Sequence, residues 1–340
     1  MGYFTGKNVL IVGGTGTIGH GLINELLKEN PKVIRIFSRD EYKQFLMQNE
    51  FRGIAEKFRF LIGDVRDYDR VERAMNGIDV VFNLAAMKHV PACEYNPEEA
   101  IRTNITGMEN VIKAATYHNV ECVVFTSSDK AINPTNSYGA TKLLAEKLVQ
   151  AANYSKGNVR TKFVAVRFGN VMGSRGSVIP LFKKQIEENA VITVTDPTMS
   201  RFMMTLSQAV KLIMTAAKEA TGGEVFILKM PVIKLIDLAK VVVEETSRKL
   251  DINPERIKIK EIGLRAGERC YEELMTREES VNAYDLGHSY VVIPSSFYIT
   301  DYKSKYSKYK KAEIGSYNSS SIEPITLDEV RQLLKNCGLL

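Results

Sequence analysis

Residues 7–19 read Lys-Asn-Val-Leu-Ile-Val-Gly-Gly-Thr-Gly-Thr-Ile-Gly and set the architecture expected for the rest of this 340-residue chain. Residues 7–12 predict a strand, and a helical run from His20 to Glu29 follows the glycines. A glycine-rich turn between a strand and a helix lets the backbone approach a pyrophosphate, which the free amides and dipole of the helix stabilise. We therefore predict a dinucleotide-binding turn. Its candidate cofactor contacts are Gly13, Gly16, Thr17, Ile18 and Gly19.

Strands and helices alternate through the first half of the chain. Strands are expected at residues 33–37, 58–62, 79–84 and 120–127, and helical runs at 71–75, 97–118 and 142–152. This alternation predicts an α/β fold with a doubly wound parallel sheet of the Rossmann type. We expect residues 1–167 to form the nucleotide-binding domain, with 205–229 returning to it. Residues 168–204 and 230–340 are expected to form a smaller C-terminal substrate-binding domain.

The ends of the next strands supply further candidate cofactor contacts. Ser38-Arg39-Asp40 follows the second strand, about twenty residues beyond the glycines. A hydroxyl and an arginine suit a 2′-phosphate, whereas an acid there suits the ribose 2′-hydroxyl, so we predict NADP, with NAD as the alternative that Asp40 leaves open. The ends of the third and fourth strands contribute Asp64, Val65, Ala85 and Ala86. Two alanines let a cofactor lie close to the strand, although tight packing of helix on sheet explains them equally well.

The segment from Ser127 to Lys142 concentrates reactive side chains. Asp129 and Lys130 follow a strand at its C-terminal end, where open parallel sheets bind ligands. Tyr138 and Lys142 are four residues apart, so on a helix they project from one face. This arrangement predicts a catalytic site, whereas Asp129-Lys130 alone would suggest only a salt-bridged turn.

Composition and charge limit the kinds of binding partner and the cellular location that we expect for the protein. Apolar residues make up 44% of the chain and charged residues 25%, and the net charge of +6 is spread along the sequence. We expect no nucleic-acid or membrane partner, because an anionic small substrate explains the surplus equally well. The lack of a signal-peptide pattern or a long apolar run favours a cytoplasmic enzyme. Four scattered cysteines predict neither a disulfide nor a metal site.

The order of these motifs resembles the extended short-chain dehydrogenase/reductase superfamily. Within it, the chain looks most like the C5-inverting UDP-N-acetylglucosamine 4,6-dehydratases of pseudaminic acid and capsule sugar pathways. The resemblance runs from about Lys7 to about Glu279 and departs from the family at Ser128, Ala266 and Tyr271, where Thr, Pro and His are usual. It rests on the strings 37–41, 85–91, 128–131, 138–142, 167–171, 173–180 and 267–268.

The resemblance implies roles for the Ser127–Lys142 segment. Tyr138 takes the proton of the sugar 4-hydroxyl as hydride moves to the nicotinamide, and Lys142 lowers the phenol pKa and holds the nicotinamide ribose. Lys130 removes H5, and Asp129 protonates the departing 6-hydroxyl. A lysine base acts in its neutral form, so we expect a lowered pKa for Lys130, with Lys142 as one perturbing charge. Ser128 completes the catalytic set.

The substrate side of the resemblance implies a UDP-sugar. Guanidinium groups bind phosphate oxygens in a bidentate way. The candidate contacts are Lys88 on the sugar, Asn170 and Val178 on the nucleotide, Arg175, Arg201 and Arg265 on the diphosphate, and Glu268 on the ribose. The family also implies a homo-oligomer, either a dimer or a hexamer.

Several alternatives remain at this point. The scaffold also supports C4 epimerisation, retaining dehydration, and an oxidase/5,6-dehydratase reaction that releases an enone. A non-catalytic nucleotide-binding regulator is the rival from another class, and the Asp129, Lys130, Tyr138 and Lys142 set argues against it. The run Lys303–Lys311, interleaved with tyrosines, predicts a surface loop or an interface segment, with single-stranded nucleic acid as a weaker interpretation. Thr326 with Glu329 predicts a capping box on a last helix.

Overall fold

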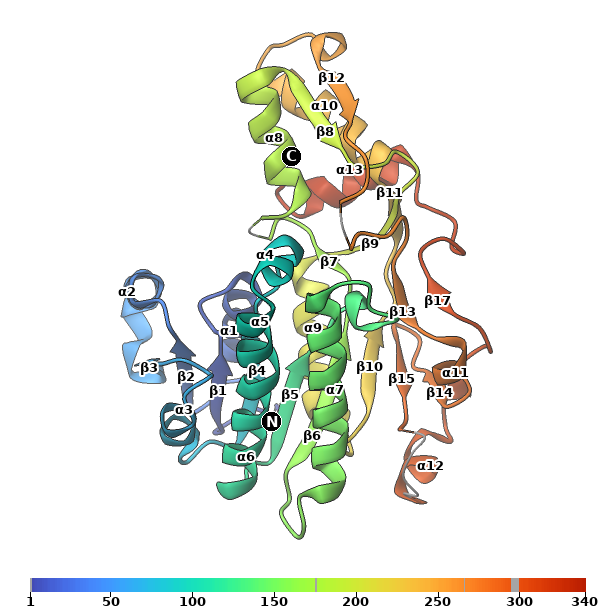
Figure 1. Ribbon diagram of the computed structural model, residues 1–340. Coiled ribbons are helices and arrows are strands. Elements are labelled where there is room, and N and C mark those ends of the chain that lie inside the picture. The colour runs from blue at the N-terminus through green and yellow to red at the C-terminus, as the bar shows by residue number, and fades with distance from the viewer. Residues whose placement is uncertain (1, 175, 266, 295–299) are drawn as a thin grey trace.

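The computed structural model describes residues 2–174, 176–265, 267–294 and 300–340. Figure 1 shows a large sheet below and a smaller unit of helices and short strands above it. The C-terminus lies in the smaller unit, whereas the N-terminus lies beside the sheet. Arg175 and Ala266 fall outside the described residues, so the expectations placed on them are not developed further.

Within the described residues the large sheet has ten strands, in the order β16-β14-β15-β10-β6-β5-β4-β1-β2-β3. The strands from β10 to β3 pair in parallel, whereas β15, β14 and β16 are antiparallel. The bounds are β1 Asn8–Val12, β2 Val33–Ser38, β3 Phe58–Ile62, β4 Val80–Asn83, β5 Cys122–Thr126, β6 Lys162–Arg167, β10 Val225–Leu228, β14 Ala283–Asp285, β15 Ser289–Val292 and β16 Lys310–Lys311. The predicted doubly wound parallel sheet is therefore confirmed.

Burial follows position in the sheet. Every residue of β4, β5 and β10 is buried, as expected for central parallel strands that are covered on both faces. At the edge, β3 exposes Arg59 and Ile62. The apolar runs thus form the main core of the molecule between the sheet and its helices.

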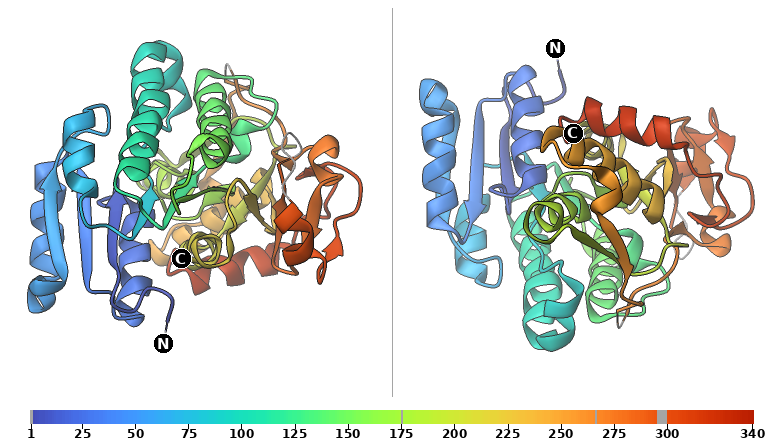
Figure 2. Two further views of the ribbon diagram at one scale, coloured as in Figure 1. Left: turned by 90° about the horizontal axis from the view of Figure 1, so that it is seen from below. Right: turned by 90° about the horizontal axis from the view of Figure 1, so that it is seen from above.

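Helices cover both faces of the sheet (Figure 2). Helix α9 packs on α1 over β5, β6 and β10, and α6 packs between α3 and α7 on the other face. The expected helix at 97–118 is divided, because a π-helical turn, η2 Arg102–Thr106, separates α5 from α6. The bounds are α1 Thr17–Lys28, α2 Glu41–Glu50, η1 Arg52–Lys57, α3 Tyr68–Met75, α4 Val90–Tyr95, α5 Pro97–Ile101, α6 Gly107–Tyr117, η3 Asp129–Ala131, α7 Ser137–Ser155 and α9 Leu206–Glu219.

The smaller unit has its own apolar core, which α8, α10 and α13 share. Thr326 and Glu329 cap α13 reciprocally, which confirms the predicted capping box. The bounds are β7 Asn170–Val171, α8 Val178–Asn189, β8 Val191–Val194, β9 Ser200–Met204, β11 Val232–Lys234, α10 Leu235–Lys249, η4 Pro254–Arg256, β12 Lys258–Glu261, β13 Glu273–Met275, α11 Arg277–Ser280, β17 Tyr317–Asn318 and α13 Leu327–Asn336.

Three short strands follow residue 280. β14, β15 and β16 extend the large sheet at its antiparallel edge. The run Lys303–Lys311 is only in part a surface loop, because it begins in helix α12 Thr300–Tyr306, which buries the rings of Tyr302 and Tyr306, and ends in β16. Buried rings are unavailable for stacking on bases, which argues against the nucleic-acid interpretation. In the described parts of the chain, no helix is both long and apolar enough to cross a membrane.

Candidate active site

The catalytic candidates gather where the C-terminal end of β5 meets helix α7. Asn136 begins α7 by accepting a hydrogen bond from the Gly139 amide at 2.8 Å. A side chain at Gly139 would lie 2.1 Å from the Lys130 carbonyl oxygen, so only glycine lets η3 pack this tightly against the helix. Tyr138 and Lys142 are buried one turn apart on α7. The helix and the 3-10 turn therefore bring the acid, the phenol and both amines together.

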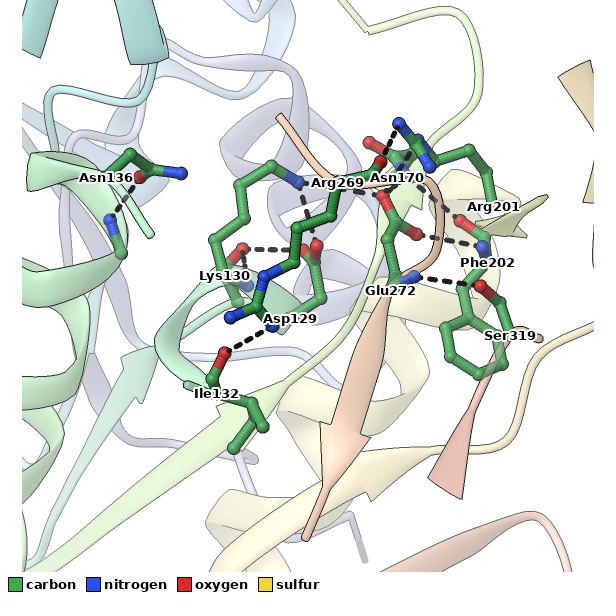
Figure 3. Close-up of polar contacts among 12 residues, drawn as sticks. Asp129, Lys130, Ile132, Asn136, Asn170, Arg201, Phe202, Arg269, Glu272 and Ser319 are labelled. Carbon is green, nitrogen blue, oxygen red and sulfur yellow. Dashed lines mark hydrogen bonds and ion pairs between the residues drawn. The ribbon is translucent and has the colours of Figure 1, made fainter. Parts of the chain in front are cut away.

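Asp129 and Lys130 form a tight ion pair (Figure 3). Lys130 Nζ donates to Asp129 Oδ2 at 2.8 Å, and Ser128 Oγ donates to Asp129 Oδ1 at 2.7 Å. Asp129 is buried, whereas the Lys130 side chain remains 32% exposed. The carboxylate is thus fixed by two donors, and the amine reaches it from the open side.

The protonation of Lys130 differs from expectation. Burial alone would lower its pKa, but the carboxylates of Asp129 and Glu272 outweigh burial and hold the pKa above the ordinary value. The expectation of a lowered Lys130 pKa is therefore wrong for this arrangement, because the nearest charges are negative. Lys130 is held as an ammonium ion beside its own proton acceptor.

Burial has the largest effect on the pKa of both Tyr138 and Lys142. Burial raises the pKa of Tyr138 to about 12, although the Lys130 charge and the Ser128 hydroxyl oppose the rise. Burial lowers the pKa of Lys142 to about 7, and its amine donates to the Thr126 carbonyl at 2.7 Å. The cation that opposes this rise in the phenol pKa is Lys130, whereas the resemblance implied Lys142.

The glycine turn fits a pyrophosphate. Gly13 has a φ of 78°, and an added Cβ would lie 2.8 Å from the Ala85 amide nitrogen, so β1 and the 85–86 segment approach closely. Gly16 is the N-cap of α1, and no side chain caps the helix there or places an acid in its first turn. The amides of Thr17, Ile18 and Gly19 therefore face a position where a bound anion is favourable. An added Cβ at Gly16 would have no neighbour closer than 3.5 Å, which leaves room for a ligand.

The segment that follows β2 carries mixed charge. Asp40 is the N-cap of α2, and its carboxylate caps the helix by accepting a hydrogen bond from the Lys43 amide at 3.0 Å. Arg39 is exposed and lies 3.7 Å from Asp64. Burial opposes ionisation of Asp64, but hydrogen bonds from Arg66 lower its pKa overall. Ser38 is buried where its hydroxyl accepts from Gln44.

A cavity of about 200 Å³ opens beside the Asp129–Lys130 pair. Asn170, Arg201 and Glu268, three of the predicted substrate contacts, are among its lining residues. Lys88, Val178 and Arg265 are not part of its described lining. Burial lowers the pKa of Lys88. Arg201 donates to the Ser200, Cys270 and Arg269 carbonyls, so several of its N–H groups are used in hydrogen bonds within the protein.

Sequence reasoning missed Glu272, a buried carboxylate in the cavity wall. Its Oε1 accepts from Asn170 Nδ2 at 2.7 Å and lies 3.7 Å from Lys130 Nζ. Figure 3 shows its carboxylate next to the Lys130 amine, on the side toward Arg201 and Phe202. The nearby Gly267-Glu268 string was the only available signal, and a Glu four residues beyond it is unremarkable in a sequence.

The segment 267–273 also forms hydrogen bonds with the loop that joins Lys130 to Tyr138. Thr135 and Asn136 both donate to the Gly267 carbonyl, at 3.1 and 3.0 Å. Arg269 donates to the Ile132 and Asn133 carbonyls, and Asn133 donates to Glu273. Catalytic candidates and substrate-side residues are therefore held in one connected structure.

This fold, with Tyr138 and Lys142 on the helix after β5, defines an extended short-chain dehydrogenase/reductase. Residues 9–294 match the family described as polysaccharide biosynthesis protein, and the chain belongs to that family.

Three comparisons refine this assignment. A UDP-N-acetylglucosamine 4,6-dehydratase (inverting) of Campylobacter jejuni subsp. jejuni is 45% identical over 294 residues, which cover 86% of this chain and 84% of that protein. A UDP-glucose 4-epimerase of Rickettsia bellii is 42% identical over 339 residues, 98% of this chain and 96% of that protein. The X-ray structure of Pen from Bacillus thuringiensis has a TM-score of 0.94, with 55% identity and full coverage of both chains. The predicted resemblance is thus confirmed at the level of the family.

Proposed function

We propose that the protein is a C5-inverting UDP-N-acetylglucosamine 4,6-dehydratase that forms UDP-2-acetamido-2,6-dideoxy-arabino-hexos-4-ulose. The observation that carries the proposal is the Asp129–Lys130 pair, 2.8 Å apart, at the wall of the cavity and within electrostatic reach of Tyr138. The inverting dehydratase relative supports the same reaction.

The chemistry requires redox and acid–base groups together. H5 of a hexose is not acidic, but oxidation of C4 to a ketone makes H5 acidic and turns the 6-hydroxyl into a β leaving group. A bound nicotinamide supplies the hydride acceptor for C4 and the hydride donor for C6. Tyr138 takes the 4-hydroxyl proton, assisted by the Lys130 charge and the Ser128 hydroxyl.

The ion pair holds one proton that serves both later steps. Transfer of that proton from Lys130 Nζ to Asp129 Oδ2, over 2.8 Å, produces a neutral amine and a carboxylic acid at once. The amine then removes H5, and the acid protonates the departing 6-hydroxyl, which leaves as water. Hydride then returns to C6, and a proton adds to C5 from the opposite face, which inverts C5. A raised Lys130 pKa is compatible with this scheme, because the pair, not the lysine alone, needs a defined proton count.

The proposed cofactor is NADP, held throughout the cycle. Gly13, Gly16 and the α1 amides would bind its pyrophosphate, and Ala85 and Ala86 would line its path along the strand ends. Exposed Arg39, beside the Ser38 hydroxyl, suits a 2′-phosphate, whereas Asp40 is engaged as a helix cap. The NAD alternative requires a carboxylate on the ribose, for which Asp40 would have to leave α2.

C4 epimerisation is the second candidate function, because epimerase-named relatives cover almost the whole chain. An epimerase needs the phenol and the hydride acceptor but has no use for an acid–base pair directed at C5 and C6. A third outcome, release of the 4-keto-5,6-ene, uses the same residues and omits the return of hydride to C6.

Product mass separates these reactions. The purified protein is incubated with UDP-N-acetylglucosamine and no added cofactor. We expect a product lighter by one water, whereas release of the enone removes two further hydrogens, one left as hydride on the nicotinamide and one as the proton taken by Tyr138. A product of unchanged mass would indicate epimerisation and would overturn the proposal.

A further inference from the structure

Glu272 occupies an unusual place for a carboxylate. The residue is 6% exposed. It lies between the Asp129–Lys130 pair and the smaller unit. The Glu272 Oε2 accepts from the Phe202 amide at 2.9 Å, and its Oε1 accepts from Asn170 Nδ2 at 2.7 Å. The two donors come from β9 and β7, so the carboxylate orientation is fixed by the smaller unit.

Two cations lie within ion-pair distance of this carboxylate. Glu272 Oε1 is 3.7 Å from Lys130 Nζ and 3.5 Å from Arg201 Nε. Arg201 is engaged by backbone carbonyls, whereas Lys130 is about one-third exposed and borders the cavity. Removing charge from water is costly unless it is paired, so a buried carboxylate at this position favours the Lys130 ammonium ion.

Lys130 is thus flanked by two carboxylates from different parts of the chain. Asp129 belongs to η3 beneath it, and Glu272 lies just before β13. A long lysine side chain has many rotamers, and a second anion near the first restricts its amine to the cavity wall.

We infer that Glu272 is a positioning residue that, together with Asp129, holds the Lys130 amine at the cavity wall. This inference rests on the proposed role of Lys130 as the base that removes H5. Glu272 acts through Lys130 and needs no contact with the reacting atoms. It also gives the smaller unit a direct means to place a catalytic group.

The charges around the pair define the expected pH behaviour. Asp129, Glu272 and Tyr138 face Lys130, and Asp129, Lys130 and Arg201 face Glu272. Burial and the Asp129 charge raise the Glu272 pKa, against the opposing effect of Lys130 and Arg201. Loss of the Glu272 charge therefore lowers the pKa at which Lys130 releases its proton.

The test compares wild type, Glu272→Gln and Glu278→Gln. The Glu272→Gln change keeps the side-chain length, and Glu278 is an exposed acid on α11 that provides the same change of charge away from the cavity. The first readout is the pH midpoint at which Lys130 reacts with an amine-acylating reagent, followed by mass spectrometry. The second is the basic limb of the kcat/KM profile with UDP-N-acetylglucosamine.

We expect the Lys130 midpoint of Glu272→Gln to fall by about one pH unit or more, with the basic limb moving with it, while Glu278→Gln matches wild type. An unchanged midpoint in folded Glu272→Gln protein overturns the inference. A shifted midpoint with an unshifted basic limb also overturns it, because Lys130 would then not limit the reaction. If wild type does not act on this sugar nucleotide but the midpoint moves, the proposed function fails and the placement of Lys130 by Glu272 stands.

Discussion

At the scale of single residues, the site depends on how each amine is surrounded. Lys130 and Lys142 lie on opposite sides of Tyr138 in the chain, yet negative charges raise the pKa of Lys130 and burial lowers that of Lys142. A sequence shows two lysines near a tyrosine. It does not show which lysine lies beside carboxylates in the fold, because the carboxylate of Glu272 is 142 residues away from Lys130 in the chain.

The lowered pKa of Lys142 predicts a pH-dependent stability. The folded pKa is about 7 and the ordinary value is 10.5, so between these pH values the unfolded chain binds more protons than the folded one. Stability from this residue is therefore lowest below about pH 7 and rises as the pH increases towards 10.5, by up to about 1.4 kcal/mol per pH unit.

Lys142→Met removes this titration. We expect urea unfolding at pH 7, 8 and 9 to show that the free energy of unfolding of wild type increases, relative to that of Lys142→Met, as the pH rises. Lys147→Met, an exposed change on the same helix, should run parallel to wild type. Parallel curves for wild type and Lys142→Met would show that Lys142 titrates normally.

At the scale of elements, the parallel strands were the most predictable part. β3 Phe58–Ile62 has the expected bounds, and β2 ends one residue beyond the expected 33–37, because both are short apolar-rich segments bounded by turns. The π-helical turn at Arg102–Thr106 and the burial of Tyr302 and Tyr306 were not predictable. Both depend on packing against distant segments, since Asn104 bonds Met87 and Thr141, and Tyr306 bonds Glu224.

The glycine turn makes a prediction at this scale. An added methyl at Gly19 would lie 2.0 Å from the Gly14 carbonyl oxygen, whereas at Gly16 its nearest neighbour is 3.5 Å away. We expect Gly19→Ala to lose both stability and cofactor binding. Gly16→Ala should keep a melting temperature within a few degrees (roughly 1 kcal/mol) and bind NADP at least about tenfold more weakly.

Calorimetric titration with NADP and thermal unfolding separate the two variants. The methyl of Gly16→Ala fills the space that the turn leaves for the pyrophosphate, so its effect is confined to binding. Wild-type NADP affinity in Gly16→Ala would mean that the pyrophosphate lies elsewhere.

At the scale of the whole molecule, the two units are interleaved in sequence and joined at the site. Residues 206–228 return to the large sheet, and the 267–273 segment returns from the smaller unit to the catalytic loop. The domain limits expected from the sequence remain a prediction, and the edge strands β14–β16 show why. Short antiparallel strands at a sheet edge carry little sequence signal.

A buried ion network adds a second connection across the molecule. Arg167 at the end of β6 is fully buried and donates to Glu146 on α7 at 2.9 Å and to Glu279 on α11 at 2.7 and 2.8 Å. Arg167→Met leaves the buried Glu146 and the partly buried Glu279 without their cation. We expect a loss of about 3–5 kcal/mol in the free energy of unfolding.

Denaturant unfolding of Arg167→Met against Arg277→Met measures this loss. Arg277 is exposed on α11, so its replacement should change stability by less than about 0.5 kcal/mol. Equal stabilities for the two variants would show that solvent or rearrangement compensates the Arg167 charge.

The most direct measurement of the central claim, that the Asp129–Lys130 pair acts at C5, is the reaction of UDP-N-acetylglucosamine in heavy water. We expect a product that carries solvent deuterium at C5 with inverted configuration, and no such product from Lys130→Met. A product with retained C5 configuration, or with its original hydrogen at C5, would contradict it.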